Sequence, residues 1–151
     1  MASARADHSR RSLRGKVLIV DDHEGIRELL RTILEDDYRV AEADSGAALH
    51  EALAHEQPDV VLLDMKLPDA NGLGLLPAIK QRWPETQVIV LTGAPKDSEA
   101  MLAAIEAANR GAFSLISKSA DFDMRKLLAG VSNAMDRRFQ SQTDGSARPQ
   151  T

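Results

Sequence analysis

Five polar residues stand where short apolar runs of this sequence end, and their side chains could together bind a cation and a phosphoryl group. The runs and their residues are Val17–Val20 with Asp21 and Asp22, Val60–Leu63 with Asp64, Val88–Leu91 with Thr92, and Phe113–Ile116 with Lys118 two positions on. These residues lie far apart in the sequence. They can act together only if the fold brings the ends of the four runs to one place.

The three carboxylates dictate what such a site would bind. Asp21, Asp22 and Asp64 would repel one another at neutral pH, so they need a cation. A set of oxygen ligands without His or Cys is typical of a hard metal ion, which favours Mg²⁺, with Mn²⁺ as the alternative. A hydroxyl and an ammonium group beside that ion, as Thr92 and Lys118 would provide, suit the oxygens of a transferring phosphoryl group. A carboxylate nucleophile among them makes an aspartyl-phosphate site.

The elements that must position these residues alternate along the chain. Apolar runs without polar alternation are followed by segments with helical spacing, which predicts an α/β fold with a parallel sheet covered on both faces. The predicted strands are the four runs above and Arg39–Ala43. The predicted helices lie near residues 26–34, 48–53, 75–79, 100–108 and 127–135, with Ser45 as the N-cap of the second and Asp121 or a neighbour as the cap of the last. Ligands of such sheets bind at the carboxyl ends of the strands.

Each site residue also has an ordinary structural interpretation. An Asp pair after a strand is often a turn or a helix cap, Thr92 before Gly93 could serve a turn, and a single lysine is usually solvated. The combination favours a site, because all these residues occupy equivalent positions at successive strand ends.

Composition narrows the class of protein. The chain has 151 residues, a formal net charge of −4 and no cysteine, which excludes disulfides, thiolate zinc sites, cysteine nucleophiles and iron–sulfur clusters. The acidic balance argues against direct nucleic-acid binding, and no apolar run is long enough to span a membrane. We expect a cytoplasmic protein with a disordered basic tail at 1–15, one domain at 16–138, and a disordered tail or the start of a linker at 139–151.

Over residues 16–138 the sequence resembles the receiver domain of bacterial two-component response regulators. The matching stretches are Val17–Asp22, Leu62–Gly72, Val90–Ala94 and Gly111–Lys118. The resemblance implies a flavodoxin-like (βα)5 fold with strand order 2-1-3-4-5. It also implies a domain that is a signalling phosphoacceptor rather than an enzyme, with at most self-phosphorylation from small donors and slow self-dephosphorylation.

Position by position, the resemblance makes Asp64 the phosphoacceptor. Asp22 would bind Mg²⁺ directly, Asp21 would support the ion largely through water, and the backbone carbonyl of Lys66 would complete the protein ligands. Thr92 and Lys118 would bind oxygens of the phosphoryl group. The donor would be a histidine kinase or a histidine phosphotransfer protein, and phosphorylation would switch protein contacts, including a homodimer through the face of the fourth helix, fifth strand and fifth helix.

Two positions depart from the family pattern. Leu115 stands where an aromatic switch residue is usual, and Ser119 stands where proline usually follows the lysine. Two alternatives therefore stay open. One is an atypical receiver that acts as an interaction module without phosphorylation. The other is a phosphatase of the haloacid-dehalogenase type, although such enzymes carry the nucleophile after the first strand.

Overall fold

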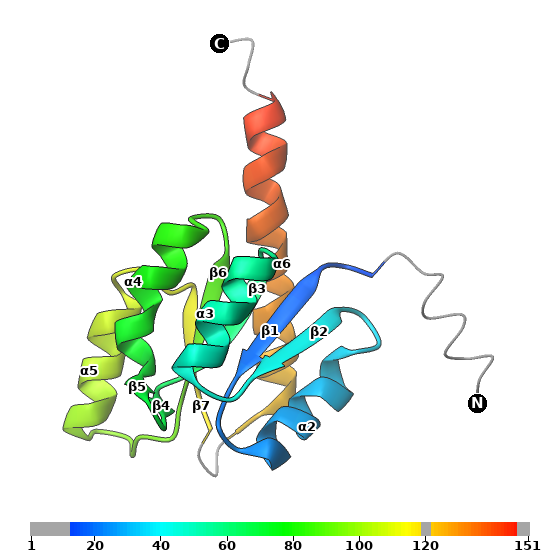
Figure 1. The fold of residues 1–151 in the computed structure, drawn as a ribbon. Helices are drawn as coiled ribbons and strands as arrows, with labels where there is room; N and C mark the ends of the chain where they lie inside the picture. Colours follow the sequence, from blue (N-terminus) through cyan, green and yellow to red (C-terminus); the bar gives the residue numbers. More distant parts are fainter. Residues whose placement is uncertain (1–12, 119–121, 148–151) are drawn as a thin grey trace, which may run out of the picture.

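The fold is built on one sheet of five parallel strands, in the order β2-β1-β3-β6-β7 (Figure 1). The computed structural model describes residues 13–118 and 122–147. The strands are β1 (Lys16–Val20), β2 (Arg39–Ala43), β3 (Val60–Asp64), β6 (Gln87–Thr92) and β7 (Ser114–Ser117). When the strands of this sheet are counted in chain order, their arrangement is 2-1-3-4-5, so the predicted flavodoxin-like order is confirmed.

Helices cover both faces of the sheet. They are α2 (Glu24–Leu34), α3 (Gly46–His55), α4 (Gly72–Arg82), α5 (Glu99–Ala108) and α6 (Met124–Ala147). Apolar side chains of α2 and α6 pack against one face, and those of α3 and α4 pack against the other. Alternate residues of a strand enter opposite layers, as Val17 and Leu18 of β1 do. This arrangement explains why the central strands are apolar at every position, since neither face meets water.

Local hydrogen bonds determine where the helices begin. Ser45 accepts a hydrogen bond from the backbone N–H of Ala48, so the predicted N-cap of α3 is confirmed. At the start of α6 the side chain of Asp123 accepts a hydrogen bond from the N–H of Arg125 at 2.9 Å. Asp123 therefore acts as the cap, whereas Asp121 lies outside the described residues.

A short hairpin that the sequence did not predict follows β3. Its strands β4 (Lys66–Leu67) and β5 (Ala70–Asn71) pair antiparallel and lead directly into α4. Between them lies Asp69, which accepts hydrogen bonds from the N–H groups of Gly46 at 2.7 Å and Ala47 at 3.0 Å. The hairpin thus ties the start of α3 to the segment that follows the predicted phosphoacceptor.

The last helix runs further than the sequence predicts. Residues 139–151 were predicted to be a disordered tail or the start of a linker, and within the described residues α6 continues through Ala147. No proline interrupts the segment until Pro149, so the backbone can continue its helical hydrogen bonds. Residues 1–12 and 148–151 lie outside the described residues. Among the described helices, none is long and apolar enough to cross a membrane.

An arginine attaches α6 to the opposite end of the sheet from the predicted site. The buried side chain of Arg138 lies 3.1 Å from Asp59 and 3.0 Å from Glu85. Both acidic residues lie in the loops that precede β3 and β6. The contacts hold the last helix against the amino ends of these strands.

The first residue of α4 must be small for Asp64 to lie where it does. A Cβ atom added to Gly72 would lie 1.9 Å from the backbone carbonyl oxygen of Asp64, whereas one added to Gly74 would meet nothing within 4 Å. We predict that Gly72→Ala lowers the free energy of unfolding by about 3 kcal/mol, because the backbone must shift. Gly74→Ala, the control on the same helix, should raise it by about 0.5–1 kcal/mol. Urea denaturation measures both, and equal effects would contradict this packing.

Candidate functional site

The carboxyl edge of the sheet brings the predicted residues together. Asp21 and Asp22 follow β1, Asp64 is the last residue of β3, Thr92 is the last residue of β6, and Lys118 follows β7. β3 pairs with both β1 and β6, and β6 pairs with β7, so these strand ends are neighbours. The convergence follows from the parallel register alone.

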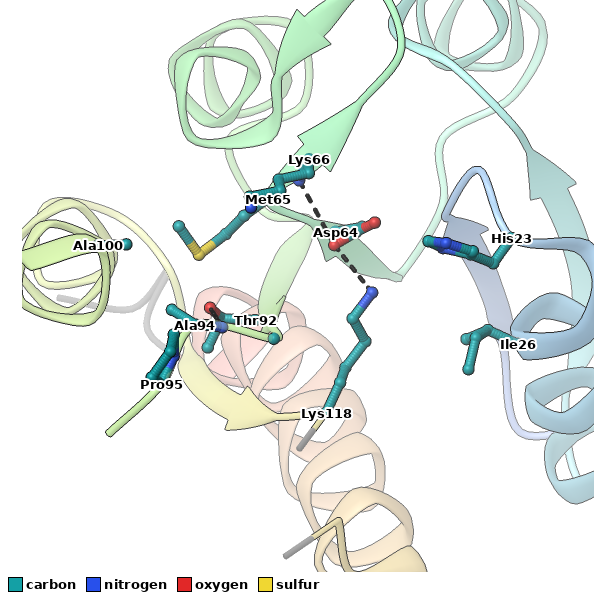
Figure 2. Close-up of a pocket in the computed structure, with 11 residues that line it drawn as sticks. His23, Ile26, Asp64, Met65, Lys66, Thr92, Ala94, Pro95, Ala100 and Lys118 are labelled. Carbon is teal, nitrogen blue, oxygen red and sulfur yellow. Dashed lines mark hydrogen bonds and ion pairs between the residues drawn. The ribbon is translucent and has the colours of Figure 1, made fainter. Parts of the chain in front are cut away.

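Lys118 is the cation of the site in this structure. Its Nζ lies 3.0 Å from an oxygen of Asp64 (Figure 2). It also lies 3.0 Å from an oxygen of Asp21. Its backbone N–H donates a hydrogen bond of 2.6 Å to the carbonyl oxygen of Thr92, which holds the end of β7 beside the end of β6. Lys118, which follows β7, therefore contacts residues at the ends of β1, β3 and β6.

The two N-terminal carboxylates have different surroundings. The side chain of Asp21 is fully buried and accepts a hydrogen bond of 2.9 Å from the backbone N–H of His23. The side chain of Asp22 is 37% exposed. Asp22 is therefore open to an ion arriving from solvent, whereas Asp21 is held by donors of the protein.

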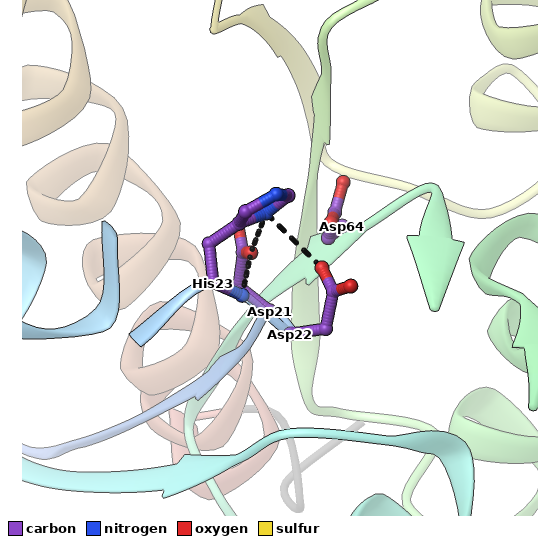
Figure 3. A group of neighbouring side chains, drawn as sticks. All are labelled: Asp21, Asp22, His23 and Asp64. Carbon is purple, nitrogen blue, oxygen red and sulfur yellow. Dashed lines mark hydrogen bonds and ion pairs between the residues drawn. The ribbon is translucent and has the colours of Figure 1, made fainter. Parts of the chain in front are cut away.

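A histidine that the sequence analysis missed belongs to the same cluster. One ligand atom each from Asp21, Asp22, His23 and Asp64 lies within 4.8 Å of the others (Figure 3). His23 thus adds a nitrogen donor beside the predicted oxygen ligands, and the ligand set itself stays a prediction. The available signal was position, since His23 directly follows Asp22. Three converging carboxylates are a donor set that fits Mg²⁺.

Burial and neighbouring charges alter the pKa values of the central pair. Burial raises the pKa of Asp64, and the negative charge of Asp21 adds to this effect, although the hydrogen bond from Lys118 opposes it. For Lys118, burial lowers the pKa, but the hydrogen bonds and charges of Asp64 and Asp21 outweigh it and the pKa is raised. The pair is coupled, and Lys118 keeps its proton because two carboxylates face it.

A cavity of about 420 Å³ opens beside Asp64. Its apolar wall includes Met65, and its polar lining comes from His23, Asp64, Lys66, Thr92 and Lys118. The cavity gives space for a group attached to Asp64, within reach of a hydroxyl and an ammonium group.

Thr92 and Lys66, which line this cavity, each make a local hydrogen bond. The hydroxyl oxygen of Thr92 accepts a hydrogen bond from the N–H of Ala94 at 3.0 Å. The backbone N–H of Lys66 donates to Asp64 at 3.4 Å. The metal-ligand role of the Lys66 carbonyl stays a prediction.

The two predicted switch positions, Thr92 and Leu115, lie apart: Thr92 lines the cavity that contains Asp64, whereas Leu115 does not. Leu115 is half-buried in β7 and packs against the layer of α3 and α4. It also borders a second hollow of about 350 Å³, next to Met101 and Lys126. Ser119, the other departure from the family pattern, lies outside the described residues.

Known proteins are similar to this chain in sequence and in fold. The response regulator receiver domain family matches residues 17–132. The chain is 40% identical to the DNA-binding transcriptional regulator NtrC of Escherichia coli over 111 residues, covering 73% of this chain and 23% of NtrC. It is 41% identical to the response regulator protein PilR of Pseudomonas aeruginosa over 120 residues, covering 77% of this chain and 26% of PilR. The chain thus spans about a quarter of the length of these curated relatives.

A solved structure agrees with the fold. The CheY-like response regulator receiver domain protein from Methanospirillum hungatei superposes with a TM-score of 0.74 at 29% identity, covering 86% of this chain and 99% of that one. The family match extends over most of the chain and includes the strand ends that carry Asp21, Asp22, Asp64 and Thr92. This chain belongs to the response regulator receiver domain family of two-component signalling.

Proposed function

We propose that this domain accepts a phosphoryl group on Asp64 from a histidine kinase or a histidine phosphotransfer protein, in a reaction that depends on Mg²⁺. Receiver domains are generally signalling phosphoacceptors rather than catalytic enzymes. The observation that carries the proposal is the position of Asp64, which ends β3, lies 3.0 Å from Lys118 and borders the cavity of about 420 Å³.

The side chains at the edge have distinct roles in this reaction. Asp21, Asp22, Asp64 and the backbone carbonyl of Lys66 would hold Mg²⁺, which when bound neutralises the carboxylates and the phosphoryl oxygens. A carboxylate oxygen of Asp64 attacks phosphorus while the bond from phosphorus to the imidazole nitrogen of the donor breaks. The electron pair of the broken bond stays with that nitrogen. Asp64 must be ionised beforehand, because its oxygen supplies the electron pair of the new bond to phosphorus.

Lys118 and Thr92 then stabilise the product. Lys118 already donates to Asp64, so it can turn toward an oxygen of the new phosphoryl group without leaving the site. The hydroxyl of Thr92 can donate to a second oxygen. Because the backbone N–H of Lys118 donates a hydrogen bond to the carbonyl oxygen of Thr92, a shift of either residue moves the ends of β6 and β7 together.

The surface next to these strand ends supports a role in protein contacts. Leu102 and Ile105 of α5 are 63% and 42% exposed, and Met124 of α6 is 43% exposed. These apolar side chains lie on the two helices that flank β7. We propose that phosphorylation changes contacts made by this face, with a homodimer as one such contact.

The first test is direct labelling of Asp64. The full chain is incubated with Mg²⁺ and a small phosphodonor such as acetyl phosphate, and the added phosphoryl group is detected by intact mass. We expect wild type to be labelled and Asp64→Asn to remain unlabelled, because the amide is not a nucleophile. Asp136→Asn, an exposed position on α6, is the matched control and should be labelled like wild type. Equal labelling of Asp64→Asn would overturn the assignment, and loss of labelling without Mg²⁺ is also expected.

A second test separates a phosphorylation switch from a constitutive interaction module. Beryllofluoride with Mg²⁺ mimics the phosphoryl group, and amide chemical shifts report the response of α5 and β7. We expect large shifts there in wild type. In Thr92→Val the shifts at Asp64 should persist and those of α5 should shrink, because the hydroxyl contact is lost. An unchanged spectrum for wild type would favour the interaction module.

A third test uses stability, because burial raises the pKa of Asp64. Asp64 therefore loses its proton less readily in the folded chain than in the unfolded chain. As the pH rises through the folded-state pKa, the contribution of Asp64 to the free energy of unfolding is lost. We predict that Asp64→Asn raises the free energy of unfolding of the metal-free protein at neutral pH. This gain in the free energy of unfolding should shrink as the pH is lowered toward about 4, the ordinary pKa of a carboxyl group. Urea denaturation in a chelator measures it, and a loss of stability at neutral pH would contradict the prediction.

A further inference from the structure

His23 is held against the carboxylate cluster without serving as a cap or as part of the core. Its side chain is 68% exposed, and although it occupies the N-cap position of α2 it makes no side-chain capping hydrogen bond. Its Nδ1 lies 3.2 Å from Oδ1 of Asp21 and 3.1 Å from Oδ1 of Asp22. The ring therefore contacts both carboxylates that the proposed function assigns to the metal ion.

The loop that carries His23 is fixed by the backbone. The N–H of His23 donates to Asp21 at 2.9 Å, and the guanidinium of Arg27 donates to the carbonyl oxygen of Asp21 at 2.7 Å. The carbonyl oxygen of His23 accepts a hydrogen bond from the N–H of Arg27 at 3.1 Å. These bonds place the imidazole at the cluster before any ion binds.

The spacing of these atoms suits neighbouring ligands of one ion. Metal–ligand bonds of about 2.1 Å at right angles place adjacent ligand atoms about 3.0 Å apart. The separations of 3.1 and 3.2 Å between Nδ1 and the two carboxylate oxygens are close to that value. In the metal-free chain the same separations let an Nδ1–H group donate to the carboxylates, so binding of an ion through Nδ1 uses the other tautomer, with the proton on Nε2. A set of carboxylates and one imidazole suits first-row transition ions, whereas Mg²⁺ prefers oxygen ligands and keeps its waters.

We propose that His23 is a direct ligand, through unprotonated Nδ1, for a divalent transition ion at the site where Mg²⁺ would support phosphorylation. The inference rests on the proposed function only in requiring that the carboxylate cluster hold a divalent cation. Mg²⁺ binds there through oxygen atoms alone, whereas an ion of the Mn²⁺ to Zn²⁺ series gains the imidazole nitrogen. This domain therefore discriminates between metal ions by a residue that stands next to its metal-binding carboxylates.

The test compares two ions on the same proteins. Isothermal titration at one fixed pH measures the affinities of tag-free full chain for Mg²⁺ and for Co²⁺, and the visible absorption of Co²⁺ reports its ligands. The variants are His23→Phe, which keeps a ring and removes the nitrogen, and His55→Phe, a matched control at the exposed end of α3. Circular dichroism verifies that each variant is folded.

We expect His23→Phe to weaken Co²⁺ binding about tenfold or more, and to leave Mg²⁺ affinity within about twofold. The Co²⁺ absorption bands should move to longer wavelength, because a nitrogen ligand has been replaced by water. His55→Phe should leave both affinities and the absorption of cluster-bound Co²⁺ unchanged. An equal loss of Mg²⁺ and Co²⁺ affinity in His23→Phe would mean that the imidazole acts only through charge or hydrogen bonds, and would overturn the proposal. Unchanged Co²⁺ affinity and absorption would overturn it as well.

Failure of the proposed function has a different signature. Asp22→Asn should weaken both ions, since it removes a carboxylate common to both binding modes. If Asp22→Asn binds both ions like wild type, the cluster is not a cation site and both proposals fail. If Mg²⁺ binds and supports labelling of Asp64 by the phosphodonor but His23→Phe does not alter the preference for Co²⁺, the phosphoacceptor role stands and the role of His23 is overturned.

Discussion

Lys118 lies between two carboxylates that could not otherwise be buried so close together. Asp21 is fully buried and Asp64 is 3% exposed, so their mutual repulsion is poorly screened by water. One ammonium group, 3.0 Å from each, compensates this charge in the metal-free chain. The arrangement leaves an excess of negative charge, with Asp22 added at the surface. Three carboxylates and one ammonium group leave two negative charges, which a divalent cation can neutralise before a negatively charged phosphoryl group is added.

The sheet allows this concentration of charge because its interior is uniformly apolar. The β1, β3 and β6 strands have fully buried residues on both faces, and the two helical layers exclude water from them. The polar residues of these three strands stand at the strand ends, with Asp64 and Thr92 at the carboxyl ends. Folding and binding therefore use different parts of the same strands. The apolar residues before Asp64 hold the strand, and Asp64 is its last paired residue, opposite Leu91 of β6.

The fold and most of the site could be predicted because both depend on strong local patterns. A run such as Val60–Leu63 can only be a buried element, and parallel strands bring the residues after each run to one edge. His23 was missed because its role depends on the direction of its ring, which no periodicity encodes. The β4–β5 hairpin depends on Asp69 reaching the start of α3, a tertiary contact. The extension of α6 was missed because polar residues without apolar spacing do not reveal a helix.

With that extension, α6 is a long helix whose contacts through Arg138 lie beyond its middle. At 1.5 Å per residue the 24 residues of α6 span about 36 Å, and the helix projects beyond the body of the domain (Figure 1). Arg138 holds it at Asp59 and Glu85, and the nine helical residues beyond that point extend about 13 Å. A tilt of about 10° at Arg138 would displace the far end by about 2 Å, by the geometry of a rod of that length. The helix thus has the geometry of a lever arm, in which a small change of angle at the sheet corresponds to a displacement of about 2 Å at the far end.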